Sequence, residues 1–439
     1  MGNLATPPSV QKLQTALHTK AKGTPGFRFY ALYDKLYRED VLRYAYACCK
    51  ANGGAAGVDG EQFEDIEARG LEHWLGGLAE ELKQKKYQPQ AALRVYIPKQ
   101  SGPGLRPLSI PTIRDRTVQT AARLVLEPIF EADFPDEQHG YRPERDALAA
   151  VRQVHGLLNS GHTQVVDADL SAYFDTIPHA ELLQCLARRI IDRQMLHLIK
   201  MWLQAPAEEH GEGGRKLRTT RNRDEGRGIP QGSPLSPLLS NIYMRRFVLG
   251  WKHLGHERRL EARIVTYADD LVICCKGSAE EALQAMQNIM RRLRLTVNEC
   301  KTQVCQLPEQ YFDFLGYTFG RCYSTQNGRA YIGTRPSKKS VRRILESLHE
   351  KTARDRTWLS AEEVVSEINR TLRGWANYFK LGPVGRSYTL IDRYTAIRLR
   401  RWLHCKHPHA KRWQTQALYR DLGLLRLADV PRSFPWAKA

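Results

Sequence analysis

The stretch TYADDLVICC, residues 266–275, places two aspartates side by side between apolar and β-branched runs. Both flanking runs favour extended chain. Neighbouring residues of a straight strand face opposite sides, so Asp269 and Asp270 can share one site only at the tip of a tight hairpin, where Asp is tolerated. An ordinary surface turn is the simplest alternative, but both flanks are too apolar for surface strands. A buried pair of carboxylates indicates a bound cation, most often Mg²⁺ with phosphate chemistry.

The charge of the chain is strongly positive and unevenly distributed. Among 439 residues, 67 Lys and Arg stand against 47 Asp and Glu, which gives a net charge of +20. Residues 321–439 hold 25 basic and 9 acidic side chains, so most of the excess lies in the last quarter. This asymmetry predicts a polyanionic partner, most simply nucleic acid. A generally basic protein without such a partner is the alternative.

The nine cysteines form no CxxC pairs and follow no regular spacing. Neither a disulfide framework nor a zinc module is expected, which fits a reducing cytoplasm. The N-terminus lacks the apolar core of a signal peptide. No apolar run approaches the length needed to span a membrane, so no membrane partner is expected.

Periodicity predicts mixed helices and strands as far as about residue 334. A Gly/Pro/Ser-rich hairpin loop is expected over 99–105, and residues 206–228 are predicted to form a charged hairpin or loop. The expected helices cover 27–52, 112–132, 180–204, 237–248 and 278–294, and the expected strands cover 93–98, 164–169 and parts of 311–334.

Beyond residue 335 the apolar spacing becomes helical. One stripe begins at Val341, and Ser360 with Glu363 forms a capping-box pattern that opens a second helix. These stripes predict the packing faces of a helical domain whose other faces carry arginines. The two stripes are Val341, Ile344, Leu345 and Leu348, then Val365, Ile368, Leu372, Trp375 and Phe379.

A third carboxylate is needed to hold two metal ions in a phosphoryl-transfer site. The apolar strand at 165–169 delivers Asp167 or Asp169 to its end, on the same face, and both remain candidates at this point. A turn and helix then bring Phe174 back over the strand end. The loop GIPQGSPLSP, residues 228–237, is made rigid by Gly and Pro and is suited to place backbone against a nucleotide.

Seven ordered motifs resemble the reverse transcriptases, and more narrowly the group II intron type with a maturase domain. AGVDG (56–60) is similar to that family's N-terminal extension and GWANYFKLG (374–382) to its maturase or thumb segment. The motifs are VYIPK…GLRPLSIPTIRDRTVQ (95–119), HGYRPERDALAAV (139–151), DLSAYFDTIPH (169–179), GIPQGSPLSPLLSNIYM (228–244), YADD (267–270), LTVNECKT (295–302) and FLGY (314–317).

The resemblance implies an α+β fold of the right-hand polymerase type, with fingers, palm and an α-helical thumb/maturase domain. It divides the chain into an N-terminal extension with the start of the fingers (1–90), reverse transcriptase fingers and palm (91–320), the thumb/maturase domain (335–410) and a short basic C-terminal segment (411–439). The family's H-N-H endonuclease motif is not found, so the chain is not expected to cut a second DNA strand.

The resemblance also implies the metal site. Asp169, Asp269 and Asp270 are similar to the three metal-binding aspartates, which hold two Mg²⁺ ions, with Mn²⁺ as a substitute. Asp169 is preferred over Asp167 because the family places an aromatic residue five positions later, which here is Phe174. That aromatic resembles the gate that blocks a ribose 2′-hydroxyl.

The nucleotide-binding residues follow in the same way. Lys99 and Arg106, seven positions apart, resemble the triphosphate-binding pair of the fingers. Gln231 resembles a glutamine that contacts the incoming nucleotide. Lys301 resembles a catalytic cation near the leaving pyrophosphate.

The implied activity is RNA-directed DNA synthesis with dNTPs on an RNA template and DNA primer, together with binding of intron RNA and of target DNA. A bacterial cytoplasmic location, in nucleoid or ribonucleoprotein particles, is expected. The alternatives are an RNA-binding splicing factor with a silent polymerase domain, and a domesticated defence or CRISPR-linked reverse transcriptase. The arginines expected to bind RNA are Arg342, Arg343, Arg398, Arg400 and Arg401.

Overall fold

A computed structural model describes residues 4–98, 104–210, 216–324, 327–408 and 413–430. The first part is a cluster of helices around α6, which contacts α1, α2, α3 and α12. Most of α6 is buried, and Thr112 caps its first turn by accepting a hydrogen bond from the Asp115 amide. The helices are α1 (Pro8–Gly23), α2 (Tyr33–Leu36), α3 (Glu39–Asn52), α4 (Phe63–Ala68), α5 (Leu71–Lys83) and α6 (Ile113–Glu131).

The structure corrects two predicted helices for one shared reason. Phe29 pairs with Ile190 in an isolated β-bridge, so residues 27–32 are not helical. The chain therefore breaks between α9 (His179–Ala187) and α10 (Arg193–Gln204), instead of forming one helix over 180–204. Asp192 fixes this junction, because its carboxylate accepts from the Leu32 and Tyr33 amides at 2.8 Å and also caps α10.

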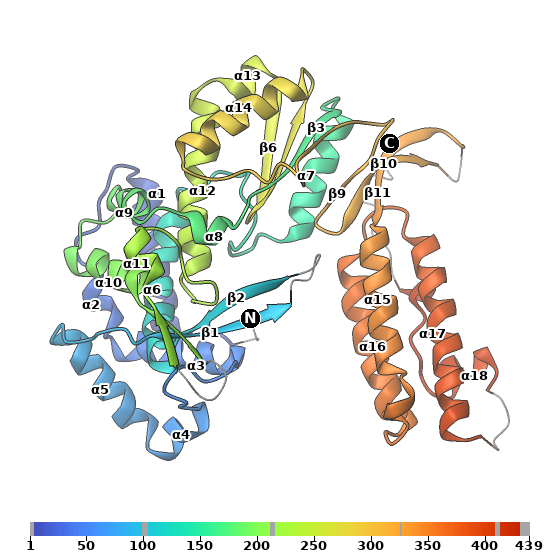
Figure 1. Ribbon diagram of the computed structural model, residues 1–439, viewed down its shortest axis with the longest axis horizontal. Helices are drawn as coiled ribbons and strands as arrows, with labels where there is room; N and C mark the ends of the chain where they lie inside the picture. The colour runs from blue at the N-terminus through green and yellow to red at the C-terminus, as the bar shows by residue number, and fades with distance from the viewer. Residues whose placement is uncertain (1–3, 99–103, 211–215, 325–326, 409–412, 431–439) are drawn as a thin grey trace.

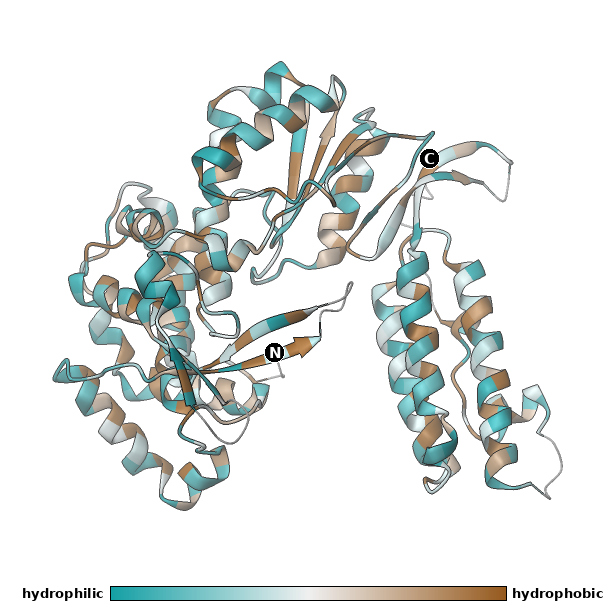
Figure 2. Cartoon of the chain, viewed as in Figure 1, coloured by the Kyte–Doolittle hydropathy of each residue, from teal (hydrophilic) through white to brown (hydrophobic). Residues whose placement is uncertain are grey.

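The central antiparallel sheet has the strand order β6-β7-β3-β8. Its two faces are both covered, by α14 with α12 on one side and by α7 on the other. Strands buried on both faces need continuous apolar runs, which is why 264–267 and 271–275 carry so few polar residues. The elements are β3 (Gln164–Asp169), β6 (Ala262–Tyr267), β7 (Asp270–Cys275), β8 (Gln303–Gln306), α7 (Ala147–Asn159), α12 (Ser236–His253) and α14 (Ala279–Arg292). Figure 2 shows apolar residues concentrated in these strands.

A second sheet has the order β2-β1-β4-β5, and its β1–β2 hairpin extends toward the C-terminal helices (Figure 1). The predicted strand at 93–98 is confirmed as β1, and 206–228 contains the expected hairpin. Most of the predicted loop at 99–105 lies outside the described residues. The elements are β1 (Ala92–Pro98), β2 (Leu105–Ile110), β4 (Ala207–His210), β5 (Lys216–Thr219) and the short helices α8 (Tyr173–Thr176), α11 (Arg221–Glu225) and α13 (His256–Arg259).

A third sheet, with the order β11-β10-β9, leads into the C-terminal helices. The predicted capping box of Ser360 and Glu363 is confirmed at the start of α16. The expected boundary at residue 410 does not coincide with a packing boundary, because Leu418 and Leu427 are buried in the same core as α15–α17. The elements are β9 (Phe312–Phe314), β10 (Tyr317–Tyr323), β11 (Ala330–Pro336), α15 (Lys338–Lys351), η2 (Arg354–Arg356), α16 (Ala361–Tyr378), α17 (Gly385–Lys406), α18 (Thr415–Arg420) and η3 (Leu427–Asp429).

The helical part joins the third sheet through tyrosines. The Tyr378 hydroxyl donates to the Leu315 carbonyl at 2.8 Å, and Tyr317 packs between Tyr378 and Phe379. Fingers-like helices and hairpin, a palm-like sheet and a helical thumb thus follow one another along the chain, as expected for a right-hand polymerase fold (Figure 1). None of the helices in the described ranges is both long and apolar enough to traverse a bilayer.

Candidate active site

The aspartate pair lies at the tip of the predicted hairpin. Tyr267 pairs with Asp270 across β6 and β7, which leaves Ala268 and Asp269 as the turn. Ala268 has a φ of +58°, in the left-handed region that tight turns of this kind require. The flanking strands are buried as predicted, whereas Asp269 is half-buried and Asp270 is exposed. The pair therefore sits at the open end of a buried sheet, where a substrate can reach it.

A segment before α7 supports this turn from one side. The Thr266 amide donates to the Glu137 carbonyl at 2.8 Å, and the His139 amide donates to the Thr266 carbonyl at 3.0 Å. A Cβ on Gly140 would lie 2.4 Å from the Ala268 nitrogen. Only glycine fits at position 140, because any side chain would push the tip out of place.

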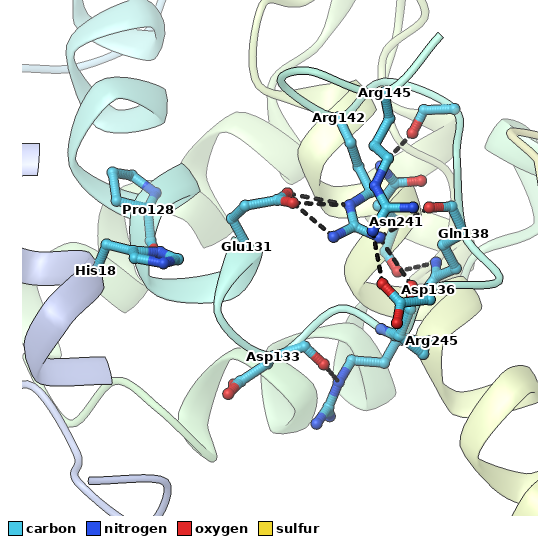
Figure 3. Close-up of polar contacts among 12 residues, drawn as sticks. His18, Pro128, Glu131, Asp133, Asp136, Gln138, Arg142, Arg145, Asn241 and Arg245 are labelled. Carbon is cyan, nitrogen blue, oxygen red and sulfur yellow. Dashed lines mark hydrogen bonds and ion pairs between the residues drawn. The ribbon is translucent and has the colours of Figure 1, made fainter. Parts of the chain in front are cut away.

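Buried polar groups fix the position of the segment 135–142 (Figure 3). Arg142 donates to both carboxylate oxygens of Glu131, at 3.0 and 3.1 Å, and to the carbonyl of Gln138 at 2.8 Å. Asn241 of α12 donates to the Gly140 carbonyl at 2.7 Å. These hydrogen bonds connect the hairpin tip to α6 and α12, so its position depends on the core of the domain.

The register of the sheet places Asp169 directly opposite Asp270 on the neighbouring strands β3 and β7. Every second residue of a strand points to the same face of the sheet. Val165 and Val272, which lie an even number of positions from Asp169 and Asp270, face α7, so the two carboxylates also lie on that face. Asp167 is two residue pairs farther into the sheet, opposite Val272 and Gln303, and its carboxylate accepts from Gln303 Nε2 at 3.0 Å.

The carboxylates raise one another's affinity for protons. The side chain of Asp270 is accessible at the strand end, but the protein packed around it partly desolvates the carboxylate. This desolvation raises the pKa of Asp270 to about 7, and the charges of Asp269, Asp169 and Asp167 add to the rise. Desolvation also raises the pKa of Asp269, and that of Asp167 to about 6. Such an excess of negative charge is relieved by cations.

Two side chains hold Asp169 in place. Lys301 Nζ donates to Asp169 Oδ2 at 2.9 Å, and Asn298 Nδ2 donates to the same oxygen at 3.1 Å. The Asn298 amide also donates to the Asp169 carbonyl at 2.8 Å. The backbone and the carboxylate of Asp169 are therefore both bound to the turn that carries Lys301.

The donor set suits Mg²⁺, which prefers carboxylate oxygens. Within the described ranges, no three His, Cys, Asp or Glu side chains already converge as metal ligands, the three aspartates included. Asp169 Oδ2 is paired with Lys301, so a cation bound by this oxygen would compete with the ammonium group. The residue types and their placement on two adjacent strands fit the metal.

Phe174 lies on α8, after a turn at Ala172 with a φ of +47°. Its ring meets that of Tyr141 edge-on, with centroids 6.3 Å apart and an interplanar angle of 88°. The pKa of Tyr141 is raised by desolvation and then by the charge of Asp269, whereas Arg106 lowers it. Phe174 and Tyr141 thus stand beside the carboxylates and near the fingers hairpin.

The loop 228–237 contacts both the hairpin β1–β2 and α8. The Ser109 amide donates to the Gln231 carbonyl at 2.6 Å, and a Cβ on Gly232 would lie 2.4 Å from the Ser109 carbonyl oxygen. Gln231 Nε2 donates to Asp175 at 3.2 Å. Arg106 is exposed on β2, and Lys99 lies outside the described residues.

The arginines expected to bind RNA differ in their surroundings. Arg342 is exposed on α15, with Glu346 at 3.6 Å, and Arg343 and Arg401 are also exposed. Arg398 is half-buried and donates to Thr352 Oγ1 at 3.0 Å and to the Thr352 carbonyl at 2.8 Å. It therefore binds the C-terminal end of α15. Arg400 is half-buried on α17.

Tyr141, Asn298 and Gly140 are neighbours of the site that sequence reasoning did not single out. Tyr141 lies in the quoted motif HGYRPERD, but nothing in that motif indicates that its ring meets Phe174. Asn298 lies three positions before Lys301, and only the fold brings it to Asp169.

Comparisons with known proteins identify the family. Residues 97–319 match the family model "Reverse transcriptase (RNA-dependent DNA polymerase)", and residues 341–419 match "Group II intron, maturase-specific domain". Protein YkfC of Escherichia coli K12 is 32% identical, over 75% of this chain and 93% of its own length. The group II intron-encoded protein LtrA of Lactococcus lactis is 27% identical, over 80% of this chain and 71% of its own.

An uncharacterized 91 kDa protein in the cob intron of Schizosaccharomyces pombe is 26% identical, over 79% of this chain and 50% of its own length. The motifs, the right-hand fold and the two matched domains agree with one another. The chain therefore belongs to the reverse transcriptases, which are RNA-directed DNA polymerases, and within them to the group II intron type that carries a maturase domain.

Proposed function

We propose that this reverse transcriptase adds deoxynucleotides to a primer 3′-hydroxyl by phosphoryl transfer at two Mg²⁺ ions bound by Asp169, Asp269 and Asp270. The main support is that Asp169 stands opposite Asp270 on adjacent strands, with Asp269 at the adjoining turn. Held by these three carboxylates, the ions would supply activation of the hydroxyl and neutralisation of charge on the phosphates. Loss of primer extension with retained RNA binding in Asp269→Ala tests the assignment.

The other side chains bind and orient the nucleotide. Arg106, with Lys99, contacts the triphosphate, since a guanidinium suits phosphate oxygens. Gln231 contacts the incoming nucleotide, and the close approach of its loop to β2 keeps the backbone fixed. Lys301 carries positive charge beside Asp169, where it meets the departing pyrophosphate.

Phe174→Ala is expected to admit ribonucleotides. The flat ring leaves no room for a 2′-oxygen, and packed side chains yield little, so wild type rejects them. Single-nucleotide extension with matched dNTP and rNTP measures the ratio of catalytic efficiencies. Phe174→Tyr, which keeps the ring, should keep the ratio. Equal rejection of rNTP by Phe174→Ala and wild type would make Phe174 an ordinary core aromatic.

We also propose that the helical part binds intron RNA and assists splicing, with target DNA as a further partner. Arg342→Gln combined with Arg401→Gln is expected to weaken RNA binding. The log–log salt slope should fall by about 1 for each RNA phosphate that the variant no longer neutralises. Filter binding over a salt series measures the slope.

Arg398→Gln is the matched control for this experiment. It removes one positive charge, half of the charge that the double variant removes, from a side chain that binds the end of α15. It should therefore lower the melting temperature and change the slope by less than half as much. If the double variant keeps the wild-type slope, the RNA-binding surface lies elsewhere.

A further inference from the structure

A cavity of about 510 Å³ lies where α9, α12 and the end of α6 meet. Its size falls within the range of sites that bind small ligands. Among the described residues, its lining includes none of the catalytic aspartates and none of the side chains proposed to contact the nucleotide. Four arginines line it instead: Arg188 and Arg189 at the end of α9, and Arg245 and Arg246 on α12.

Positive charge exceeds negative charge in this cavity. The four arginines face one carboxylate of the lining, that of Asp133. A second carboxylate, that of Glu181, acts on Cys185 in the lining from one turn earlier on α9, and it is already paired with Arg294 at 3.1 Å. Even when both carboxylates are counted against the four arginines, an excess of two positive charges remains.

Asp133 serves two of the arginines. Arg189 is buried, its Nε lies 3.1 Å from Asp133 Oδ2, and its Nη2 donates to the Ala21 carbonyl at 2.8 Å. Arg245 donates from Nε to the Asp133 carbonyl at 2.9 Å, and Figure 3 shows no further contact of its guanidinium among the residues drawn. Arg189 is therefore bound within the protein, whereas Arg245 keeps N–H donors for a ligand.

The other two arginines have no carboxylate partner in the described part of the chain. Arg188 is exposed, and no hydrogen bond or ion pair joins it to the described residues. Arg246 is half-buried, and its Nη1 donates to the Tyr243 hydroxyl at 3.4 Å. Desolvation raises the pKa of the Cys185 thiol, whereas the charges of these two arginines and of Arg245 lower it. The three guanidinium groups therefore gather around one thiol.

Guanidinium groups that gather with unused donors match a phosphate group. Each guanidinium can donate two parallel N–H bonds to phosphate oxygens. Like charges held close together repel one another, and a bound anion relieves that repulsion. We infer that the cavity binds a phosphate group through Arg188, Arg245 and Arg246. This inference goes beyond the proposed polymerase function, because the cavity shares no residue with the metal site. RNA and a free anion such as pyrophosphate both carry the group, and the experiment distinguishes them.

The test is calorimetric titration of the full chain with inorganic pyrophosphate, in metal-free buffer of fixed ionic strength. Arg188→Gln and Arg246→Gln, each made singly, are expected to weaken binding about tenfold, because each removes one charge-assisted contact. Arg152→Gln is the matched control, since it removes the same charge from an exposed position on α7 and should bind as wild type does. Arg106→Gln should also keep this binding, which separates the cavity from a phosphate contact at the active site. Thermal unfolding checks that each variant is folded.

A single-stranded RNA oligonucleotide identifies the source of the phosphate. If RNA supplies it, both cavity variants should bind the RNA about tenfold more weakly than Arg152→Gln does, and pyrophosphate should displace RNA from wild type. If a free anion supplies it, the RNA affinities of the cavity variants and of Arg152→Gln should agree, and only pyrophosphate binding should weaken.

Equal affinities of wild type and both cavity variants for pyrophosphate and for RNA would overturn the inference. Weaker binding of citrate by these variants, with neither phosphate probe affected, would assign the cavity to carboxylate ligands and would overturn it as well. Failure of the polymerase proposal is a separate outcome, because it is read from primer extension by Asp269→Ala.

Discussion

Asp270→Asn is expected to lower the rate of RNA-templated DNA synthesis by about a thousandfold or more, because a metal site loses one charged ligand while the side chain keeps its size. Asp270 faces Asp169 across the sheet, and no other carboxylate occupies that position in the described pairing. The measurement is single-turnover addition of one matched dNTP to a DNA primer annealed to RNA. Synthesis near the wild-type rate would remove Asp270 from the metal site.

The fold of this variant is checked by thermal unfolding without metal. The pKa of Asp270 is about 7 in the folded chain, against an ordinary value of 3.8, so the folded state binds more protons between these values. The contribution of Asp270 to stability should therefore be fully present below pH 4 and be lost as the pH rises through 7. Asp270→Asn removes this loss, so its melting temperature at pH 8 should equal or exceed that of wild type.

The second large effect separates two aspartates of one strand. Asp169→Asn is expected to abolish DNA synthesis, whereas Asp167→Asn should retain it within a few-fold. Asp169 lies opposite Asp270 and is held by Lys301 and Asn298, while Asp167 lies two residue pairs deeper and is bound by Gln303. Both substitutions remove one charge from the same face of β3, so each serves as the control for the other.

The same single-nucleotide assay, run at several Mg²⁺ concentrations, distinguishes these variants. If the missing carboxylate is needed to activate the primer hydroxyl, a higher Mg²⁺ concentration cannot restore DNA synthesis. If Asp167→Asn is inactive and Asp169→Asn active, the metal site includes Asp167. The spacing to Phe174, which favours Asp169, would then have no bearing on sugar selection.

Much of this site follows from local patterns. The hairpin at 262–275 and the strand at 164–169 come from apolar runs and a turn, which short-range chemistry determines. The alternation of side chains along the strand cannot distinguish Asp167 from Asp169, because residues two positions apart face the same side of the sheet. The strand register places Asp169 opposite Asp270, and that register depends on pairing between segments far apart in the sequence.

The differences between the sequence-based expectations and the structure have the same origin. Residues 27–32 have a helical pattern, but Phe29 pairs with Ile190 instead. Arg398 shares the helical spacing of an exposed residue, yet it binds the end of α15, which only the packing of α15 on α17 determines. Tyr141 reaches Phe174 because Gly140 fits against Ala268, and no spacing in the sequence encodes that approach.

The central claim is that the aspartates at the hairpin support DNA synthesis on RNA. Its most direct test is addition of a single dNTP by the wild-type chain to a DNA primer on an RNA template, started with Mg²⁺ and repeated with a chelator. The matched dNTP should be added only in the presence of the metal. A chain that binds the RNA with its primer but adds no nucleotide at any Mg²⁺ or Mn²⁺ concentration would contradict the account, and would indicate a splicing factor with a silent polymerase domain.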